Sequence, residues 1–144
     1  MPQRTLRVSQ QLAVAWERLQ QLESWEGIGG MGGLRDPEHF DDGSLARFAY
    51  SIDTPVGTID DTAEVTSSQA DAGDHIMAVN TETKGVRVTI DLVLSGMGAK
   101  TFVNFSIDAQ AANFLARPLA ATLRQTLESG IDREAARMVE RLEA

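Results

Sequence analysis

The stretch NFLARPLAATLRQTLESGIDREAARMVERLEA, residues 113–144, carries the helical pattern around which the rest of the chain is organised. Leucine recurs at every fourth position from Leu115 to Leu127, with alanine and threonine beside it, and charged residues such as Arg117 lie opposite. This spacing predicts one long amphipathic helix, or two in tandem, with an apolar face that needs a partner. A curved antiparallel sheet formed by residues 45–107 is the expected partner, so the predicted fold class is α+β.

The apolar stripe shifts along this stretch. At about 100° per residue, the apolar face of residues 115–127 and that of residues 131–142 are displaced by roughly a third of a turn. Gly130 suits a helix C-terminus, and Asp132 suits the N-cap of a following helix. We therefore predict a kink or break at Gly130. Pro118 either lies in the first turn of a helix that begins late or bends the helix.

Alternating apolar and polar residues predict the strands, most clearly at residues 86–94. A short first strand is followed by a helix over about residues 10–22, with Trp16 and Leu19 on its inward face. A further turn or strand at residues 24–28 would raise the sheet from six strands to seven. The other runs are joined by short turns and predict an antiparallel meander. The predicted strands are residues 4–9, 45–52, 58–67, 75–83, 86–94 and 101–107.

Residues 27–44, GIGGMGGLRDPEHFDDGS, show no period and predict a long loop. Gly27, Gly29 and Gly32 formally satisfy GxGxxG. A dinucleotide site, however, needs a strand before the glycines and a helix directly after them. Here a helix comes first and Pro37 follows, so we predict no nucleotide cofactor and expect a glycine-permitted lid or hinge instead.

The only candidate metal ligands close together in the sequence are His39 and its neighbours Glu38, Asp41 and Asp42. These residues lack the fixed ligand spacing of known metal motifs, and acidic loops are usually solvated. The chain also contains no cysteine, which excludes thiol catalysis and zinc ribbons. We predict no metal and no cofactor.

Length and charge narrow the class of protein. At 144 residues, with no linker or repeat, residues 1–144 are predicted to form a single domain. The net charge of −8 argues against a nucleic-acid partner, which needs clustered lysine and arginine, and against anionic membrane surfaces. The N-terminus lacks a signal-type apolar core, and no window suits a transmembrane helix. The expected location is the cytoplasm, without stable membrane insertion.

Residues 8–28, VSQQLAVAWERLQQLESWEGI, resemble the start of the START-like proteins, also called the SRPBCC or polyketide cyclase/dehydrase and lipid-transport superfamily. There a strand ending in Val-Ser leads into a helix with an inward Trp and then a second Trp, the places of Trp16 and Trp25 here. Residues 95–107, SGMGAKTFVNFSI, are similar to the hairpin before the family's C-terminal helix.

The resemblance implies a helix-grip fold, in which a curved antiparallel sheet wraps a long C-terminal helix around a largely apolar cavity. Members of the family bind lipids, sterols, polyketides or other aromatic molecules, and a minority are cyclases, aromatases or hydrolases. Side-chain size also favours a cavity, because only 6% of the residues are aromatic. Small residues on the helix, such as Ala116 and Thr122, would leave apolar space above a concave sheet.

Three polar residues are candidates for catalysis. Tyr50 shares a face with Phe48, so its hydroxyl is expected in or near the cavity. In the strand from residue 75, either His75 and every second residue after it face inward, or Ile76 and every second residue after it do. The pattern does not decide between them, and an inward His75 could act as an acid or base. Asn104 is the third candidate. No serine, histidine and acid set is recognisable, so enzyme activity stays uncertain and binding is favoured.

The expected function is binding or carriage of a small hydrophobic molecule: a lipid, a polyketide or an aromatic compound. The alternatives are a cyclase, aromatase or dehydrase-like enzyme, and a protein-interaction module with a filled cavity. A homodimer is a further alternative, in which the helix face is buried between two copies. The residues expected to line the ligand cavity are Trp25, Met31, Phe40, Phe48, Tyr50, Met77, Ile90, Phe105, Leu115, Leu119 and Leu123, with residues 27–44 gating access.

Overall fold

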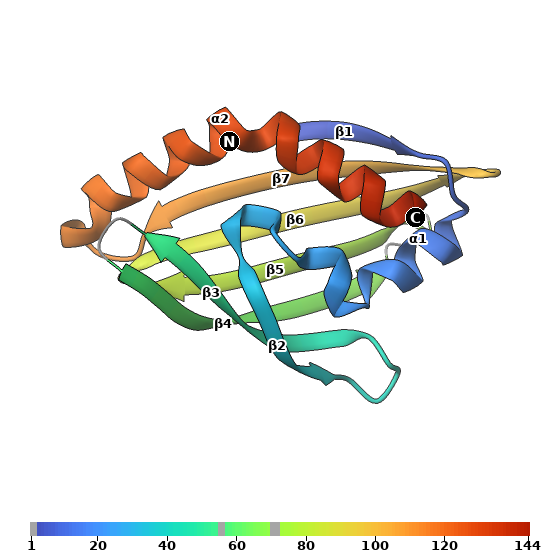
Figure 1. Ribbon diagram of the computed structural model, residues 1–144. Helices are drawn as coiled ribbons and strands as arrows, with labels where there is room; N and C mark the ends of the chain where they lie inside the picture. The colour runs from blue at the N-terminus through green and yellow to red at the C-terminus, as the bar shows by residue number, and fades with distance from the viewer. Residues whose placement is uncertain (1–2, 55–56, 70–72) are drawn as a thin grey trace.

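The computed structural model describes residues 3–54, 57–69 and 73–144. Seven antiparallel strands form one curved sheet in the order β1-β7-β6-β5-β4-β3-β2, and a long helix crosses its concave face (Figure 1). This is the helix-grip arrangement, with the strand number at the upper end of the predicted range. The elements are β1 Gln3–Val8, α1 Leu12–Leu19, the 3-10 turns η1 Leu22–Trp25 and η2 Ile28–Gly30, β2 Gly32–His39, β3 Leu45–Thr54, β4 Gly57–Gln69, β5 His75–Thr83, β6 Val86–Met97, β7 Lys100–Ala111, η3 Phe114–Ala116 and α2 Arg117–Glu143.

The strands predicted from alternation are confirmed, and their parity sets what faces inward. In β6, the buried residues Val86, Ile90 and Leu92 alternate with less buried polar residues. β7 follows the same rule along its length, and β1 pairs with it from Gln3 to Val8. β1 and β2 occupy the two ends of the strand order.

The seventh strand is β2, and it lies outside residues 24–28, where the sequence suggested a further turn or strand. Residues 24–28 lie in 3-10 turns, whereas β2 occupies part of the predicted loop and pairs with β3. Three register shifts interrupt that pairing, and Asp36 adopts a positive φ of 55°. Shifts of this kind destroy strict alternation, so β2 carries no period-2 signal in the sequence.

Of the kink or break predicted at Gly130, the break is wrong, because α2 is helical from Arg117 to Glu143. Asp132 does not cap a new helix; its Oδ1 accepts a hydrogen bond of 2.7 Å from Arg4 Nε of β1. Pro118 lies in the first turn, where the missing N–H is harmless. Figure 1 shows α2 rising over one end of the sheet and descending over the other, so this continuous helix bends near its middle.

The inward face of α2 starts from alanines rather than from the predicted leucines. Leu115 is 88% exposed and Leu119 is 38% exposed, whereas Ala116 and Ala120 are buried against Val86 and Ala109 of the sheet. Small side chains let the helix approach the sheet closely. From there one stripe at helical spacing continues along the helix, with a drift of about 80° from its first to its last residue: Ala116, Ala120, Leu123, Leu127, Ile131, Ala135, Met138 and Leu142.

The glycine-rich segment lies between α2 and the sheet; we call residues 27–31 the glycine plug. Buried Glu134 accepts a hydrogen bond of 3.1 Å from Gly29 N, and Arg137 donates one of 2.8 Å to Gly27 O. A Cβ added at Gly29 would lie 3.5 Å from the terminal methyls of Ile90 and Ile107. The segment therefore packs under the C-terminal half of α2, within van der Waals distance of the sheet.

Replacing Gly130 by alanine should stabilise the protein. Gly130 lies inside a continuous helix, where glycine costs roughly 0.5–1 kcal/mol relative to alanine. An added Cβ would meet only the flexible end of Arg133, at 3.4 Å. Urea unfolding of Gly130→Ala should show a higher free energy of unfolding.

The matched control is Gly98→Ala in the β6–β7 turn. That glycine has open space around it but a φ of +65°, so alanine there should destabilise by about 1 kcal/mol. A destabilised Gly130→Ala protein would contradict a regular helical backbone at this position.

Candidate functional site

The residues expected to line a cavity divide into two groups. Seven of them come together, buried, in the main core: Trp25, Met31, Phe48, Tyr50, Met77, Ile90 and Phe105. Leu123 is partly buried. Leu115 and Leu119 point to solvent from α2, and Phe40 lies at the surface beside the β2–β3 turn, lining a hollow with Asp42 and Ser67.

The middle of the interior is filled by side chains. Trp25, Phe48, Tyr50, Met77 and Phe105 expose none of their surface to water, whereas the wall of a cavity large enough to hold water would expose some. Trp25 Nε1 donates a hydrogen bond of 2.9 Å to Leu19 O, so even its polar atom is satisfied inside. The expected central cavity is closed in this structure, because the glycine plug and Trp25 occupy the space beside α2.

One end of the interior is less well covered. Under the N-terminal half of α2, inward-facing apolar residues remain only partly buried. Val88 and Leu127 bridge the main core and the small cluster around Ala116 and Ala120. The glycine plug contacts α2 only in its C-terminal half, through Glu134 and Arg137. We call this region the open end, formed by Ile52, Ile59, Asp61, Thr81, Val88, Leu123 and Leu127.

Strand parity brings three polar side chains into the open end. Tyr50 pairs with Asp61 across β3 and β4, so both lie on the inner face. The Tyr50 hydroxyl forms a short hydrogen bond with the Thr81 hydroxyl of β5. Thr81 Oγ1 in turn donates a bond of 3.1 Å to Thr62 O.

Burial raises the pKa of the Tyr50 phenol above its ordinary value. The hydrogen bond with Thr81 acts in the opposite direction, and the nearby charge of Asp61 raises the pKa further. The phenol therefore stays protonated at neutral pH and keeps its hydrogen for Thr81.

The three catalytic candidates do not converge. His75 shares the inner face of β5 with Met77, and its ring stacks on Trp16 at a centroid distance of 4.6 Å. His75 and Thr81 are six residues apart on one strand, or about 20 Å at ~3.3 Å per residue. Asn104 is exposed on the outer face, where it accepts a hydrogen bond of 2.9 Å from Thr5. Of the three, only Tyr50 lies beside the open end, where its fully buried hydroxyl contacts Thr81.

Asp61 and Thr81 were not among the predicted site residues, although a signal for Asp61 existed. The alternation that places Ala63 and Val65 inward also places Asp61 inward, two residues earlier on β4. The position of Thr81 depended on the inward face of β5, which the sequence left undecided.

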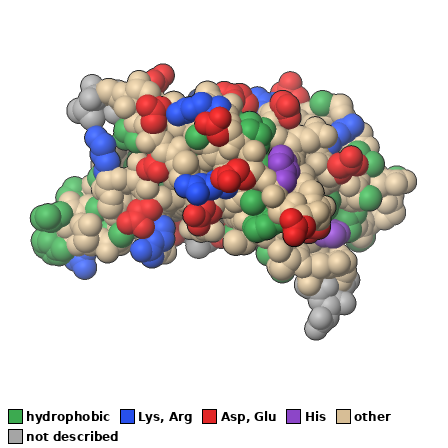
Figure 2. Space-filling model, turned by 90° about the horizontal axis from the view of Figure 1, so that it is seen from below, with side chains coloured by type: hydrophobic (Ala, Val, Ile, Leu, Met, Phe, Trp, Pro, Cys, Tyr) green, Lys and Arg blue, Asp and Glu red, His purple; other side chains and the backbone are tan. Residues whose placement is uncertain are grey.

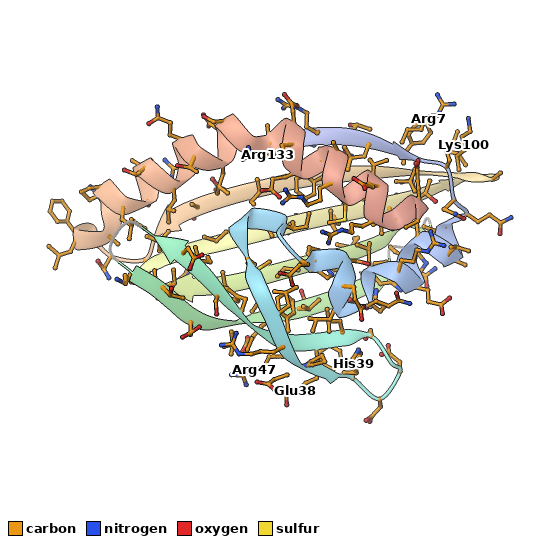
Figure 3. The ribbon with its side chains drawn as sticks, in the orientation of Figure 1. Arg7, Glu38, His39, Arg47, Lys100 and Arg133 are labelled. Carbon is orange, nitrogen blue, oxygen red and sulfur yellow. The ribbon has the colours of Figure 1, made fainter. Side chains whose placement is uncertain are left out.

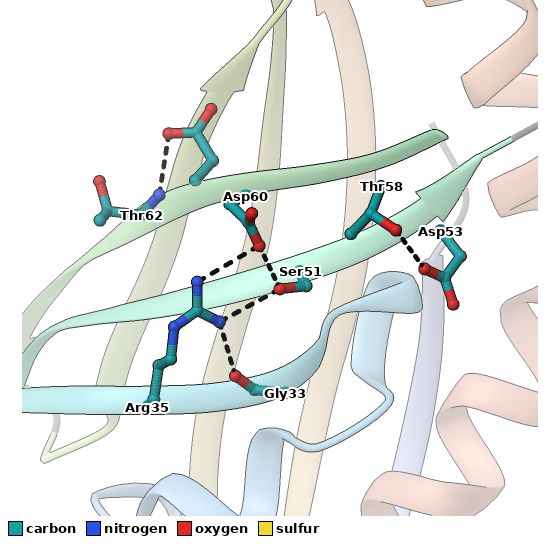
Figure 4. Close-up of polar contacts among 8 residues, drawn as sticks. Gly33, Arg35, Ser51, Asp53, Thr58, Asp60 and Thr62 are labelled. Carbon is teal, nitrogen blue, oxygen red and sulfur yellow. Dashed lines mark hydrogen bonds and ion pairs between the residues drawn. The ribbon is translucent and has the colours of Figure 1, made fainter. Parts of the chain in front are cut away.

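The outer face of the same strands carries a separate polar network. Asp60 Oδ1 accepts from the Ser51 hydroxyl and lies 3.3 Å from Arg35 Nη2 (Figure 4). The Ser51 hydrogen bond is the main reason that the pKa of Asp60 is lowered, and Arg35 adds to it. Asp60 therefore has a cationic partner, which Asp61 lacks among the described residues.

The remaining surface is mixed in charge. On the face shown in Figure 2, basic side chains lie singly among acidic ones. Glu38 and His39 lie at the lower rim of the molecule, where Glu38 is 3.9 Å from Arg47 (Figure 3). Within the described residues, no group of three or more histidine or acidic side chains is placed to hold a metal ion. Their helices include none with the length and hydropathy required to cross a bilayer.

Three solved structures share the fold. A START superfamily protein from Mycobacterium smegmatis is 11% identical, with a TM-score of 0.65 over 98% of this chain and 97% of that one. Human STARD10 is 8% identical, with a TM-score of 0.67 over 97% of this chain and 62% of that one. The di-domain ARO/CYC BexL from the BE-7585A biosynthetic pathway is 12% identical, with a TM-score of 0.63 over 99% of this chain and 46% of that one.

These similarities are structural. No family model matches the chain, and no curated protein sequence matches it. The chain spans less than two thirds of STARD10 and about half of BexL. At such low identity the comparison establishes a START-like fold, and the site must be argued from the chain's own residues.

Tyr50 is the only tyrosine, so its ionisation can be followed directly by phenolate absorbance. Because its pKa is raised in the folded state, the associated stability is fully present below the unfolded value of about 10 and is lost as the pH rises through the folded pKa. The absorbance of the native protein should rise at higher pH than that of the protein unfolded in urea.

Tyr50→Phe removes this absorbance change and should remove the corresponding fall in stability above pH ~10. A native midpoint at or below the urea-unfolded midpoint would contradict the inward, desolvated position of the hydroxyl.

Proposed function

We propose that this START-like chain binds a small hydrophobic molecule at the open end, between the sheet and the N-terminal half of α2. The observation that supports it most is the partial burial of inward-facing Ile52, Val88 and Leu127 beside an otherwise closed core. A ligand seated there would remove this apolar surface from water, at about 25 cal/mol per Å². Carriage of such a molecule in the cytoplasm by a single domain is the role we assign.

The first half of α2 makes only a small apolar contact with the sheet, which would make room for a ligand there less costly to create. Ala116 and Ala120 hold α2 to Val86 and Ala109 through small side chains, which bury less area than leucines would. The first half of α2 is therefore attached to the sheet by a smaller apolar contact than the second half, where Ile131, Met138 and Leu142 are buried. Admitting a ligand costs least where the apolar contact is smallest.

The cyclase-like alternative has less support. Catalysis of that kind would need several acid, base or positioning groups around one ligand. Of the three candidates, Tyr50 alone faces the open end, while His75 stacks on Trp16 and Asn104 lies outside. The comparison with BexL supports a shared fold and identifies no catalytic residue in this chain.

The protein-interaction alternative would use the exposed start of α2. Phe114 is 73% exposed, with the Arg117 guanidinium 5.0 Å from its ring centroid, and Leu115 is exposed beside it. A stable interface buries about 800 Å² on each partner, far more than three side chains supply. This patch does not form an interface by itself, so we favour ligand binding.

Filling the open end should block binding. We expect Leu123→Trp to weaken the binding of the uncharged fluorescent probe N-phenyl-1-naphthylamine by about tenfold or more, because overpacking removes the space the ligand needs. Leu123 is partly buried on the inward stripe. The readout is a fluorescence titration of the probe, which is excited well away from tryptophan.

Leu119→Trp is the matched control, since Leu119 is on the same helix, one turn earlier, and points to solvent. Its affinity for the probe should stay within about twofold of the original, as expected for a surface substitution. Equal affinity in the original protein and in a folded Leu123→Trp variant would place the ligand elsewhere. No probe uptake by the original protein would refute the proposed function.

A further inference from the structure

The open end contains polar groups whose hydrogen-bonding roles can be assigned. Thr62 O can only accept, so the 3.1 Å contact from Thr81 Oγ1 uses the single hydrogen of Thr81. Thr81 must then accept from Tyr50, which uses the single hydrogen of the phenol. The Tyr50 oxygen is left with acceptor capacity alone.

Asp61 is also an acceptor. Its Oδ1 accepts a hydrogen bond of 2.8 Å from Thr62 N, and an ionised carboxylate has no hydrogen to donate. No lysine, arginine or histidine of the described chain forms an ion pair with it. Asp61 therefore has spare acceptor capacity that a donor at the open end could use.

The neighbouring Asp60 has the hydrogen-bond and ion-pair partners that stabilise a carboxylate. Asp60 is on the outer face and has both the Ser51 hydroxyl and the Arg35 guanidinium (Figure 4). Asp61 is turned inward, two residues from Ile59 of the Ile52–Ile59 pair, and forms no ion pair among the described residues. A carboxylate that is partly withdrawn from water without a cation costs free energy, which a bound cation would recover.

We infer that the ligand is an amphipathic amine, whose ammonium group donates to Asp61 while its hydrocarbon part covers Val88 and Leu127. This inference rests on the proposed function, because it names the ligand class for the same site. The net charge of −8 would also draw a cation toward the protein over long range. An anionic ligand such as a fatty acid would meet a like charge at Asp61.

The preference for an amine is tested by competition among three ligands that have the same hydrocarbon tail and different head groups. Dodecylamine, dodecanol and dodecanoic acid, each below its aggregation concentration, are titrated against bound N-phenyl-1-naphthylamine. We expect dodecylamine to bind on the order of tenfold to hundredfold more tightly than dodecanol, with dodecanoic acid weakest. Asp61→Asn should remove the preference for the amine and still bind the probe.

Asp60→Asn is the matched control, since it removes the same charge one residue away on the outer face. It should keep the amine preference, which separates direct contact from the general field of the protein. Asp61→Ser serves as a second variant if Asp61→Asn fails to fold by circular dichroism. The comparison of head groups on the original protein needs no variant at all.

The outcomes are distinguishable. If the probe is displaced equally by all three ligands, hydrophobic binding stands and the amine assignment is overturned. An amine preference lost equally in Asp60→Asn and Asp61→Asn would also overturn it, because the effect would then come from net charge. If neither the probe nor dodecylamine binds, both the proposed function and the ligand class fail.

Discussion

A concave seven-stranded sheet is wider than one helix can cover. The packing of the interior depends on which residues cover the part of the sheet that the helix leaves uncovered. Strands spaced about 4.8 Å apart give a sheet roughly 30 Å across, whereas a helix with its side chains is about 10–12 Å in diameter. α2 lies mainly over β7, β1 and β6. Trp25, Ile28 and Met31 fill the remaining space under its C-terminal half. Among the described residues, none is buried in the same way under the N-terminal half of α2, which is where the open end lies.

Much of the fold was predictable because its signals are local. Strict alternation predicted six strands, and helical spacing predicted α1 and α2. β2 was missed because its register shifts depend on pairing with β3. Leu115 and Leu119 were misleading, since the most apolar face at the start of a helix need not be the buried one when close approach to the sheet requires alanine. The predicted break at Gly130 is absent because a helix interior tolerates a single glycine at a cost of about 1 kcal/mol.

The candidate site was predictable only in part, for a related reason. Buried aromatic and aliphatic residues were identified from parity, but parity says which way a side chain points and not whether space remains beside it. The glycine plug closes the middle through long-range hydrogen bonds to Glu134 and Arg137, more than a hundred residues away. Asp61 could be placed by parity alone, while its lack of a cation emerges only from the packed structure.

The strand order has a mechanical consequence. β1 and β2 stand at opposite ends of that order, so the sheet forms an open gutter and not a closed barrel. A closed barrel has a radius set by strand number and shear, and it cannot widen without losing ladder hydrogen bonds. A gutter can flex about its long axis while every strand keeps its neighbours. An open sheet can therefore change its curvature without loss of strand pairing, which a closed barrel does not allow.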